Sequence, residues 1–194
     1  MGGTVPIAVI ALRAARGTLG ANPVAEALNE LGLVALIFLL GSLAMTPLQA
    51  LFRWNWALRV RRMVGVLAFS YATLHLSTYA VVDQEVDLGA ILGDIAQRPF
   101  IFVGFAAWLL ILPLAVTSTD AIVRRLGFAR WKRLHRLAYL AGALGVVHFF
   151  LRVKRDVSEP VVYGILLAIA FAIRLGAYVR KRSVRRLRDA ARQT

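Results

Sequence analysis

The sequence predicts an all-α fold, a polytopic transmembrane bundle of five full spans preceded by a short N-terminal apolar helix. Of the 194 residues, 59% are apolar and the mean hydropathy is +0.68, whereas soluble domains are about half apolar. The apolar residues are gathered in runs long enough to cross a bilayer, which takes about 20 residues. The net charge of +14 lies between and after these runs, where basic residues set topology and contact anionic lipid.

Five runs have the length and composition of membrane-spanning helices. They cover about Leu31–Leu51, Met63–Val82, Pro99–Val116, Leu134–Leu151 and Val161–Val179. We expect Thr46-Pro47 to mark the end of the first span and Pro99 the start of the third. The run Val5–Leu12 is too short to cross alone, so either Met1 is not the natural start or this segment lies partly in the membrane interface. Residues 1–194 are expected to form one membrane domain.

Basic residues in alternate loops predict the orientation of the bundle. The loop after the first span, the loop between the third and fourth, and the tail from about residue 180 fall on one side, which the positive-inside rule makes cytoplasmic. The loop 83–98 is mostly acidic and faces the other side. The loop 152–159 also falls there, although its Arg152, Lys154 and Arg155 oppose the rule. The tail is expected to extend the last helix near the inner leaflet, with Arg180, Lys181, Arg182, Arg185, Arg186, Arg188 and Arg192.

The absence of cysteine limits the chemistry that the chain can support. It excludes disulfides, thiolate nucleophiles, Cys-ligated iron–sulfur clusters and covalent c-type haem attachment. The sequence contains no Gly-rich dinucleotide fingerprint, P-loop or H-E-x-x-H motif. No nucleic-acid motif accompanies the positive charge, so nucleic-acid binding is not expected. Any metal or cofactor must be held by histidine, carboxylates or other groups.

All three histidines of the chain, His75, His135 and His148, fall in or at the end of predicted spans. Ionisable residues inside a bilayer are costly and face the bundle interior or a cavity. A lone intramembrane histidine is more often a hydrogen-bonded core residue, but three together indicate cofactor ligation. Imidazole is also the commonest axial ligand that holds haem iron without cysteine. The histidines therefore predict b-type haem between the helices and electron transfer across the bilayer.

The depth of each histidine predicts which of them pair. The second and fourth spans both begin on the cytoplasmic side, so His75 and His148 share the outer half and are expected to bind one haem. His135 lies near the cytoplasmic end, about 20 Å from His148 along the helix, and would serve a second site. These two residues are also roughly 140° apart around an ideal helix. A bend or π-bulge at Gly142 or Gly145 would relieve that mismatch.

The predicted site at His135 has no histidine partner at the same depth. Arg61 and Arg62 are the candidates to complete it, since Arg61 lies nearly four turns before His75 on the same side of its helix. Either arginine would act as a weak second ligand, a clamp on a haem propionate or a contact for a flavin phosphate. Both are equally explained as ordinary positive-inside arginines. The expected number of haems is therefore one or two.

The segments around the histidines resemble the MsrQ (YedZ) family of the ferric-reductase-like transmembrane superfamily. The similar segments are RVRRMVGVLAFSYATLHLSTYA at 59–80, LAVTSTDAIVRRLGFARWKRLHRLAYL at 114–140, VVHFFLRVK at 146–154 and GTLGANPVAEA at 17–27. The resemblance runs from about Gly17 to Val179. Members of this family are haem-binding membrane subunits of the bacterial methionine sulfoxide reductase system MsrPQ.

The resemblance implies a location, cofactors and partners. It implies the bacterial inner membrane, b-type haem with His75, His135 and His148 as iron ligands, and FMN. Electrons would come from the quinone pool or a cytoplasmic flavin reductase and pass to MsrP, a periplasmic molybdopterin enzyme that reduces methionine sulfoxide in oxidised proteins. The sulfoxide chemistry would then occur on that partner, and whether this chain is itself an enzyme is left open. Because no flavin and nicotinamide domain follows the last span, we expect a separate electron donor.

Two other functions fit the same histidines. One is a stand-alone transmembrane ferric or metalloreductase that reduces ferric ion at its outer face, and ferric reduction by the purified chain alone would favour it. The other is a non-redox haem carrier or helical scaffold. A reducible b-type absorption band would exclude the scaffold.

Overall fold

The structure is a computed structural model that describes the backbone of residues 2–190, with all of their side chains except those of residues 181, 184–188 and 190. Arg192 of the predicted basic tail lies outside the described residues. All regular elements of the described chain are helical, and it contains no β-strand. The elements are η1 (Gly2–Thr4), α1 (Val5–Ala15), α2 (Pro23–Phe52), α3 (Asn55–Thr78), η2 (Tyr79–Asp83), α4 (Leu88–Gln97), α5 (Pro99–Val116), α6 (Asp120–Leu126), α7 (Phe128–Leu134), α8 (Leu137–Arg152) and α9 (Ser158–Ala190).

Five segments in the described part of the chain are long and apolar enough to cross a membrane. They are α2, α3 with the π-helical turn η2, α5, α7 with α8, and α9 as far as Arg180. The prediction of an all-α bundle with five full spans is confirmed. The third span has the predicted bounds, and α9 continues past the predicted end of its span as a helix to Ala190.

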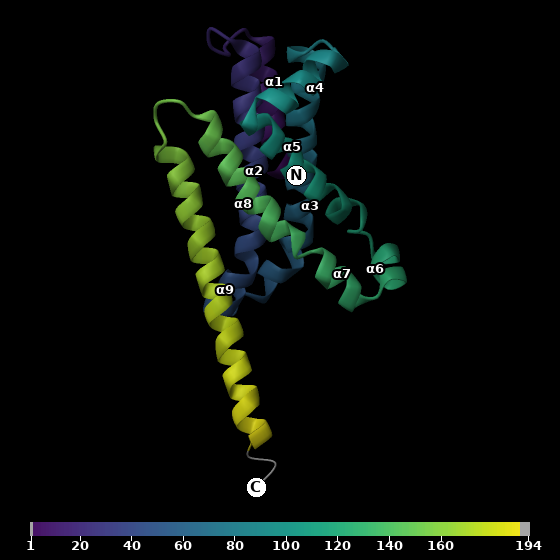
Figure 1. The fold of residues 1–194 in the computed structure, drawn as a ribbon, viewed down its shortest axis with the longest axis vertical. Coiled ribbons are helices and arrows are strands. Elements are labelled where there is room, and N and C mark those ends of the chain that lie inside the picture. The colour runs from purple at the N-terminus through teal and green to yellow at the C-terminus, as the bar shows by residue number, and fades with distance from the viewer. Residues whose placement is uncertain (1, 191–194) are drawn as a thin grey trace.

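The bundle has two distinct ends (Figure 1). The α2–α3 turn, α6, α7 and the C-terminal part of α9 lie at one end, which we call the basic end. The helix α4 and the α1–α2 and α8–α9 loops lie at the other, which we call the opposite end. Alternation of the spans thus gathers the basic loops on one side, as the sequence predicts.

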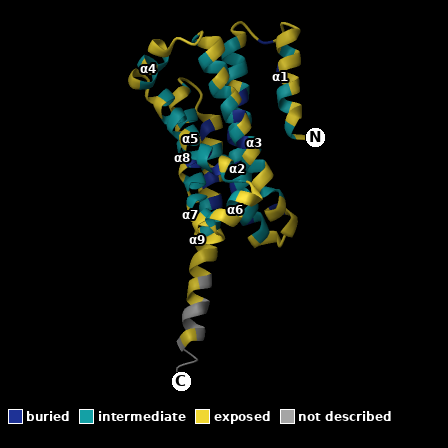
Figure 2. Cartoon of the chain, turned by 90° about the vertical axis from the view of Figure 1, so that its right-hand side faces the viewer, coloured by how far each residue is buried: buried dark blue, intermediate teal, exposed yellow. Residues whose placement is uncertain are grey.

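A leucine-rich core joins the long helices. Leu36, Leu40 and Leu43 of α2 pack with Leu167 of α9, and residues of α8 surround them. Exposed residues are distributed along the spanning helices (Figure 2), and many of them are large and apolar. Examples from two helices are Phe102 and Leu109 of α5 and Ile165 and Ile169 of α9. A surface this apolar around long apolar helices is stable in lipid but not in water, so the chain is a multi-pass membrane protein.

The N-terminal helix α1 docks onto α2 and α3. Ile10 is buried with Leu31 and Tyr71, and the Tyr71 hydroxyl donates to the Gly3 carbonyl at 2.6 Å. Arg13 forms ion pairs with two glutamates on α2, Glu26 and Glu30. The 11 residues of α1 rise only about 16 Å, roughly half the thickness of a hydrocarbon core.

The first span does not end at Thr46-Pro47, contrary to the sequence prediction. α2 continues through Pro47 to Phe52. Proline lacks the N–H that would bond the carbonyl of Leu43, four residues earlier. The guanidinium of Arg174 on α9 donates to that carbonyl instead, and this bond satisfies the freed acceptor so that the helix can continue.

The fourth predicted span, Leu134–Leu151, corresponds to the single helix α8, and a separate helix, α7, precedes it. α7 ends at Leu134 and α8 begins at Leu137, with tight turns in which the Arg136 N–H donates to Arg133 and the Tyr139 N–H to Arg136. This break places His135 at the junction, so no single ideal helix carries both His135 and His148. No π-bulge occurs at Gly142 or Gly145, since α8 is a continuous α-helix there. Gly142 and Gly145 instead let α8 approach leucine side chains of α2.

Candidate cofactor site

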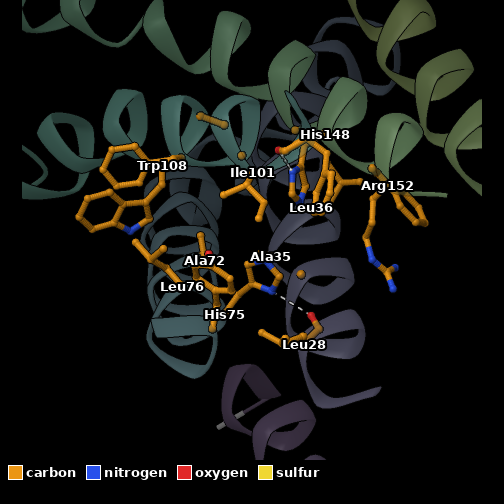
Figure 3. Close-up of a pocket in the computed structure, with 18 of the residues that line it drawn as sticks. Leu28, Ala35, Leu36, Ala72, His75, Leu76, Ile101, Trp108, His148 and Arg152 are labelled. Atoms are coloured by element: carbon orange, nitrogen blue, oxygen red, sulfur yellow. Dashed lines mark hydrogen bonds between the residues drawn. The ribbon is translucent and has the colours of Figure 1, made fainter. Parts of the chain in front are cut away.

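The structure brings His75 and His148 together in the half of the bundle near the opposite end. His75 lies near the C-terminal end of α3 and His148 near that of α8. Their ring centroids are 6.1 Å apart and the ring planes are inclined at 80°. Figure 3 shows both rings directed into the same cavity. The depth argument from the sequence therefore identified the two histidines that face each other.

Each of these imidazoles is held through its Nδ1 atom by a backbone carbonyl of a neighbouring helix. His75 Nδ1 lies 2.9 Å from the Leu28 carbonyl of α2, and His148 Nδ1 lies 2.6 Å from the Phe100 carbonyl of α5. A carbonyl oxygen only accepts hydrogen bonds, so Nδ1 carries the proton in both rings. Nε2 is then left with its lone pair, the tautomer that a metal-ligating histidine requires.

Two glycines make room for the rings. A Cβ atom on Gly104 would lie 2.6 Å from His148 Nδ1, and one on Gly32 would lie 3.2 Å from two atoms of the His75 ring. Each glycine follows the bonded carbonyl by four residues, one turn along the same helix. Both imidazoles thus have the same support, a carbonyl that orients the ring and a glycine against which it packs.

The rings line a cavity of about 530 Å³ between α2, α3, α5 and α8. Its walls are largely apolar and include Leu36, Ala72, Ile101 and Trp108 (Figure 3). The Trp108 indole is fixed by a hydrogen bond of 3.0 Å to Thr73. The volume falls in the range of about 300–1,000 Å³ that is usual for pockets binding cofactors and other small molecules.

The paired histidines fit a bis-imidazole haem site. A metal bound at about 2.0 Å by one nitrogen of each ring holds the two imidazole centroids roughly 6 Å apart. The observed separation of 6.1 Å matches this spacing. The apolar walls provide the surroundings that a flat, mostly apolar porphyrin needs, and the protonated Nδ1 atoms leave both Nε2 atoms available.

Two basic residues that line the cavity were not assigned to the site from the sequence. Arg98 and Arg152 both line the cavity. Arg98 is paired with Asp94 at 2.9 Å, whereas Arg152 makes no hydrogen bond or ion pair with any residue that the structure describes. Arg152 is close enough to act electrostatically on His75 and His148. The signal available in the sequence was its position in a loop where the positive-inside rule expects no positive charge.

His135 lies apart from this cavity, at the basic end. Its Nδ1 is 3.1 Å from the Trp131 carbonyl, and its ring lies 3.9 Å from the Trp131 ring between centroids. Arg61 is near enough to influence His135 electrostatically and donates to Thr46 at 3.3 Å. That Arg61 completes a site at His135 stays a prediction.

Arg62 does not share the neighbourhood of His135 through any described contact. Its guanidinium pairs with Asp120 at the start of α6. This guanidinium holds the pKa of the Asp120 carboxyl below its usual range. Because both side chains are largely exposed, the pair contributes little to stability. The ion pair between Arg62 and Asp120 joins α3 to α6.

Comparison with known proteins places the chain in a family. Residues 29–146 match the model of a family described as "Ferric reductase like transmembrane component". That range includes all of the second and third spanning segments and most of the first. It also includes His75 and His135. No solved structure matches the chain.

Curated relatives resemble the chain over almost its whole length. A protein of Rhodospirillum rubrum is 51% identical over 92% of this chain and 86% of its own length. One of Deinococcus radiodurans is 47% identical over 100% of this chain and 92% of its own, and one of Rhizobium meliloti is 48% identical over 88% and 77%. All three are named "Protein-methionine-sulfoxide reductase heme-binding subunit MsrQ". The chain belongs to the MsrQ family of ferric-reductase-like transmembrane proteins.

Proposed function

We propose that the chain binds b-type haem between His75 and His148 and serves as the membrane electron-transfer subunit of a methionine sulfoxide reductase system. The observation that carries this proposal is the facing pair of imidazoles, 6.1 Å apart with both Nδ1 atoms bonded to carbonyls. The names of the curated relatives, which all refer to a haem-binding subunit of such a system, support it. When bound, haem supplies a one-electron carrier within the bundle.

The chain's own residues have distinct tasks in this proposal. The carbonyls of Leu28 and Phe100 fix the orientation and tautomer of the two ligating rings. The apolar walls, with Trp108 held by Thr73, exclude water from the cavity. Excluding water keeps the surroundings of the redox centre rigid, which reduces the reorganisation that accompanies electron transfer.

Arg152 is proposed to bind a haem propionate at the opposite end. It lines the cavity and is free of partners among the described residues, and a guanidinium pairs well with a carboxylate. The sequence alone makes Arg61 and Arg62 the candidates for this task. For the haem between His75 and His148, the position of Arg152 in the same cavity favours Arg152.

The substitution Arg152→Gln is expected to weaken haem retention about tenfold, the equivalent of one charge-assisted hydrogen bond. It should also lower the reduction potential, because the cation favours the reduced and more negative haem. Redox titration of the purified protein measures the potential. Arg155→Gln is the matched control, since it removes the same charge three residues later in the chain but Arg155 does not line the cavity. Equal shifts in both variants would contradict a specific contact.

His135 is proposed to serve a second haem near the basic end, with Arg61 as a weak ligand, propionate clamp or flavin-phosphate contact. The electrostatic proximity of Arg61 to His135 supports this assignment. Two redox centres at different depths would divide the distance across the bilayer into shorter steps. FMN is proposed as a further cofactor on the strength of the family alone.

The proposed orientation and partners complete the electron path. Positive-inside loops support a C-terminus in the cytoplasm of a bacterial cell with the chain in the inner membrane. The donor is proposed to be the quinone pool or a cytoplasmic flavin reductase, and the acceptor periplasmic MsrP. Reduction of one methionine sulfoxide to methionine and water consumes two electrons and two protons, so two one-electron transfers through the chain serve each turnover.

A reconstitution experiment tests this function. Purified haem-loaded protein, reduced anaerobically and mixed with MsrP and a methionine sulfoxide substrate, should be reoxidised only when both are present. The description of the matching family favours metalloreduction as a second candidate. Reoxidation by ferric chelates with no response to MsrP would support that candidate and reject the proposed one.

A further inference from the structure

A groove at the basic end contains a charge that the proposed electron path does not use. It has a volume of about 480 Å³ and lies between α2, α8 and α9. Its walls are mostly apolar, with Pro47 and Ala50 on α2 and Phe171 and Leu175 on α9. Among the described residues that line it, Arg174 is the only one with a formal charge.

Arg174 is a cation inside a membrane span with only neutral partners. It lies on α9, about 24 Å along the helix from its first residue, Ser158. This position is within the spanning segment that ends at Arg180. Its guanidinium donates to the Tyr139 hydroxyl and the Leu43 carbonyl, and its centre lies 4.8 Å from the centroid of the Tyr139 ring. Its Nε atom is buried without a partner. These contacts orient the guanidinium but do not neutralise it.

The surroundings add positive charge instead of removing it. Arg61 is close enough to act on Arg174 electrostatically, and it donates to Thr46, which lines the same groove. Within the described part of the chain, no carboxylate forms an ion pair with either arginine. Two neighbouring cations at membrane depth are costly unless an anion compensates them. The compensating anion must therefore come from outside the described chain.

We propose that the groove binds an anionic phospholipid, with the headgroup phosphate beside Arg174 and an acyl chain along the apolar wall. The occupant follows from charge complementarity and from the exposure of the groove's rim, where Leu175 is 64% and Tyr178 is 62% exposed. Basic pockets between spanning helices on the positive side are sites of anionic lipid recognition. This inference does not depend on the haem between His75 and His148, because neither residue lines the groove.

Lipid titration of the detergent-purified full chain tests the proposal. Phosphatidylglycerol and phosphatidylcholine with identical acyl chains are added, and thermal unfolding is followed by tryptophan fluorescence, since a bound lipid raises the midpoint. The native chain should bind phosphatidylglycerol about fivefold more tightly than phosphatidylcholine. Arg174→Gln should abolish this preference and Arg174→Lys should retain most of it. Arg180→Gln, which removes a charge from the same helix outside the groove, should leave it unchanged.

A second variant and a parallel readout keep the result decisive. Ala50→Trp fills the groove without changing charge and should weaken phosphatidylglycerol binding even if Arg174→Gln does not fold. No preference in the native chain, or an equal loss in Arg180→Gln, would overturn the proposal. Displacement of bound lipid by FMN or a quinone would also overturn it and assign the groove to a cofactor or donor. Haem absorbance is recorded in the same samples. Because the fluorescence readout of lipid binding needs no haem, a negative lipid result can be distinguished from failure of the haem site.

Discussion

His75→Ala and His148→Ala are each expected to remove the haem bound between α3 and α8. Either change deletes one of the two imidazoles that face each other at 6.1 Å. Changes in the groups that merely support metal ligands cost about 10–100-fold in affinity, so loss of a ligand itself should cost more. A pyridine haemochrome assay on detergent-purified protein gives haem type and stoichiometry, and should show one haem equivalent fewer in each variant.

His135→Ala is the matched control for these two substitutions. It removes the remaining histidine, which lies at the basic end outside the cavity, and should spare the haem between α3 and α8. Circular dichroism verifies that each variant keeps its helices. Loss of all haem absorbance in His135→Ala with folding intact would contradict the two-site arrangement.

Gly104→Ala is expected to disturb haem binding almost as strongly as loss of a ligand. The added Cβ would lie 2.6 Å from His148 Nδ1, a separation that non-bonded atoms do not tolerate. The ring cannot move aside without losing its hydrogen bond to the Phe100 carbonyl. We therefore expect the low-spin absorption spectrum of a bis-histidine haem to change to a high-spin spectrum, or the haem to be lost.

The other glycines provide a graded comparison. Gly32→Ala should have a milder effect, since its Cβ would lie 3.2 Å from the His75 ring. Gly176→Ala should have none, because a Cβ there meets no atom within 4 Å. Haem content of the three variants, measured at equal protein concentration, should fall in the order Gly176, Gly32, Gly104. A haem content in Gly104→Ala equal to that in Gly176→Ala would show that the ring is not confined as the structure indicates.

Helix positions and the histidine pair were predictable from the sequence because both depend on periodic, one-dimensional features. Apolar runs give the spans, and the third has the predicted bounds Pro99–Val116. Counting residues from the basic loops gives depth, and depth alone pairs His75 with His148. That these residues ligate haem stays a prediction, since the structure provides their geometry but not their chemistry.

The remaining features depend on which helices are neighbours, and local patterns do not encode that. The carbonyls of Leu28 and Phe100 become partners of the histidines only through the packing of α2 against α3 and of α5 against α8. The continuation of α2 past Pro47 depends on Arg174, more than a hundred residues later in the chain. The break at His135 falls where the basic helix α7 is followed by the apolar helix α8, and hydropathy alone does not show whether one helix continues across that boundary.

Low-temperature electron paramagnetic resonance of the oxidised, purified protein tests the central claim most directly. Two imidazoles whose planes are inclined at 80° should give the highly anisotropic low-spin ferric signal of perpendicular axial ligands, and this signal should disappear in His75→Ala and His148→Ala. Absence of this anisotropic signal from the native protein, or its persistence in both variants, would show that these two histidines do not hold the iron together.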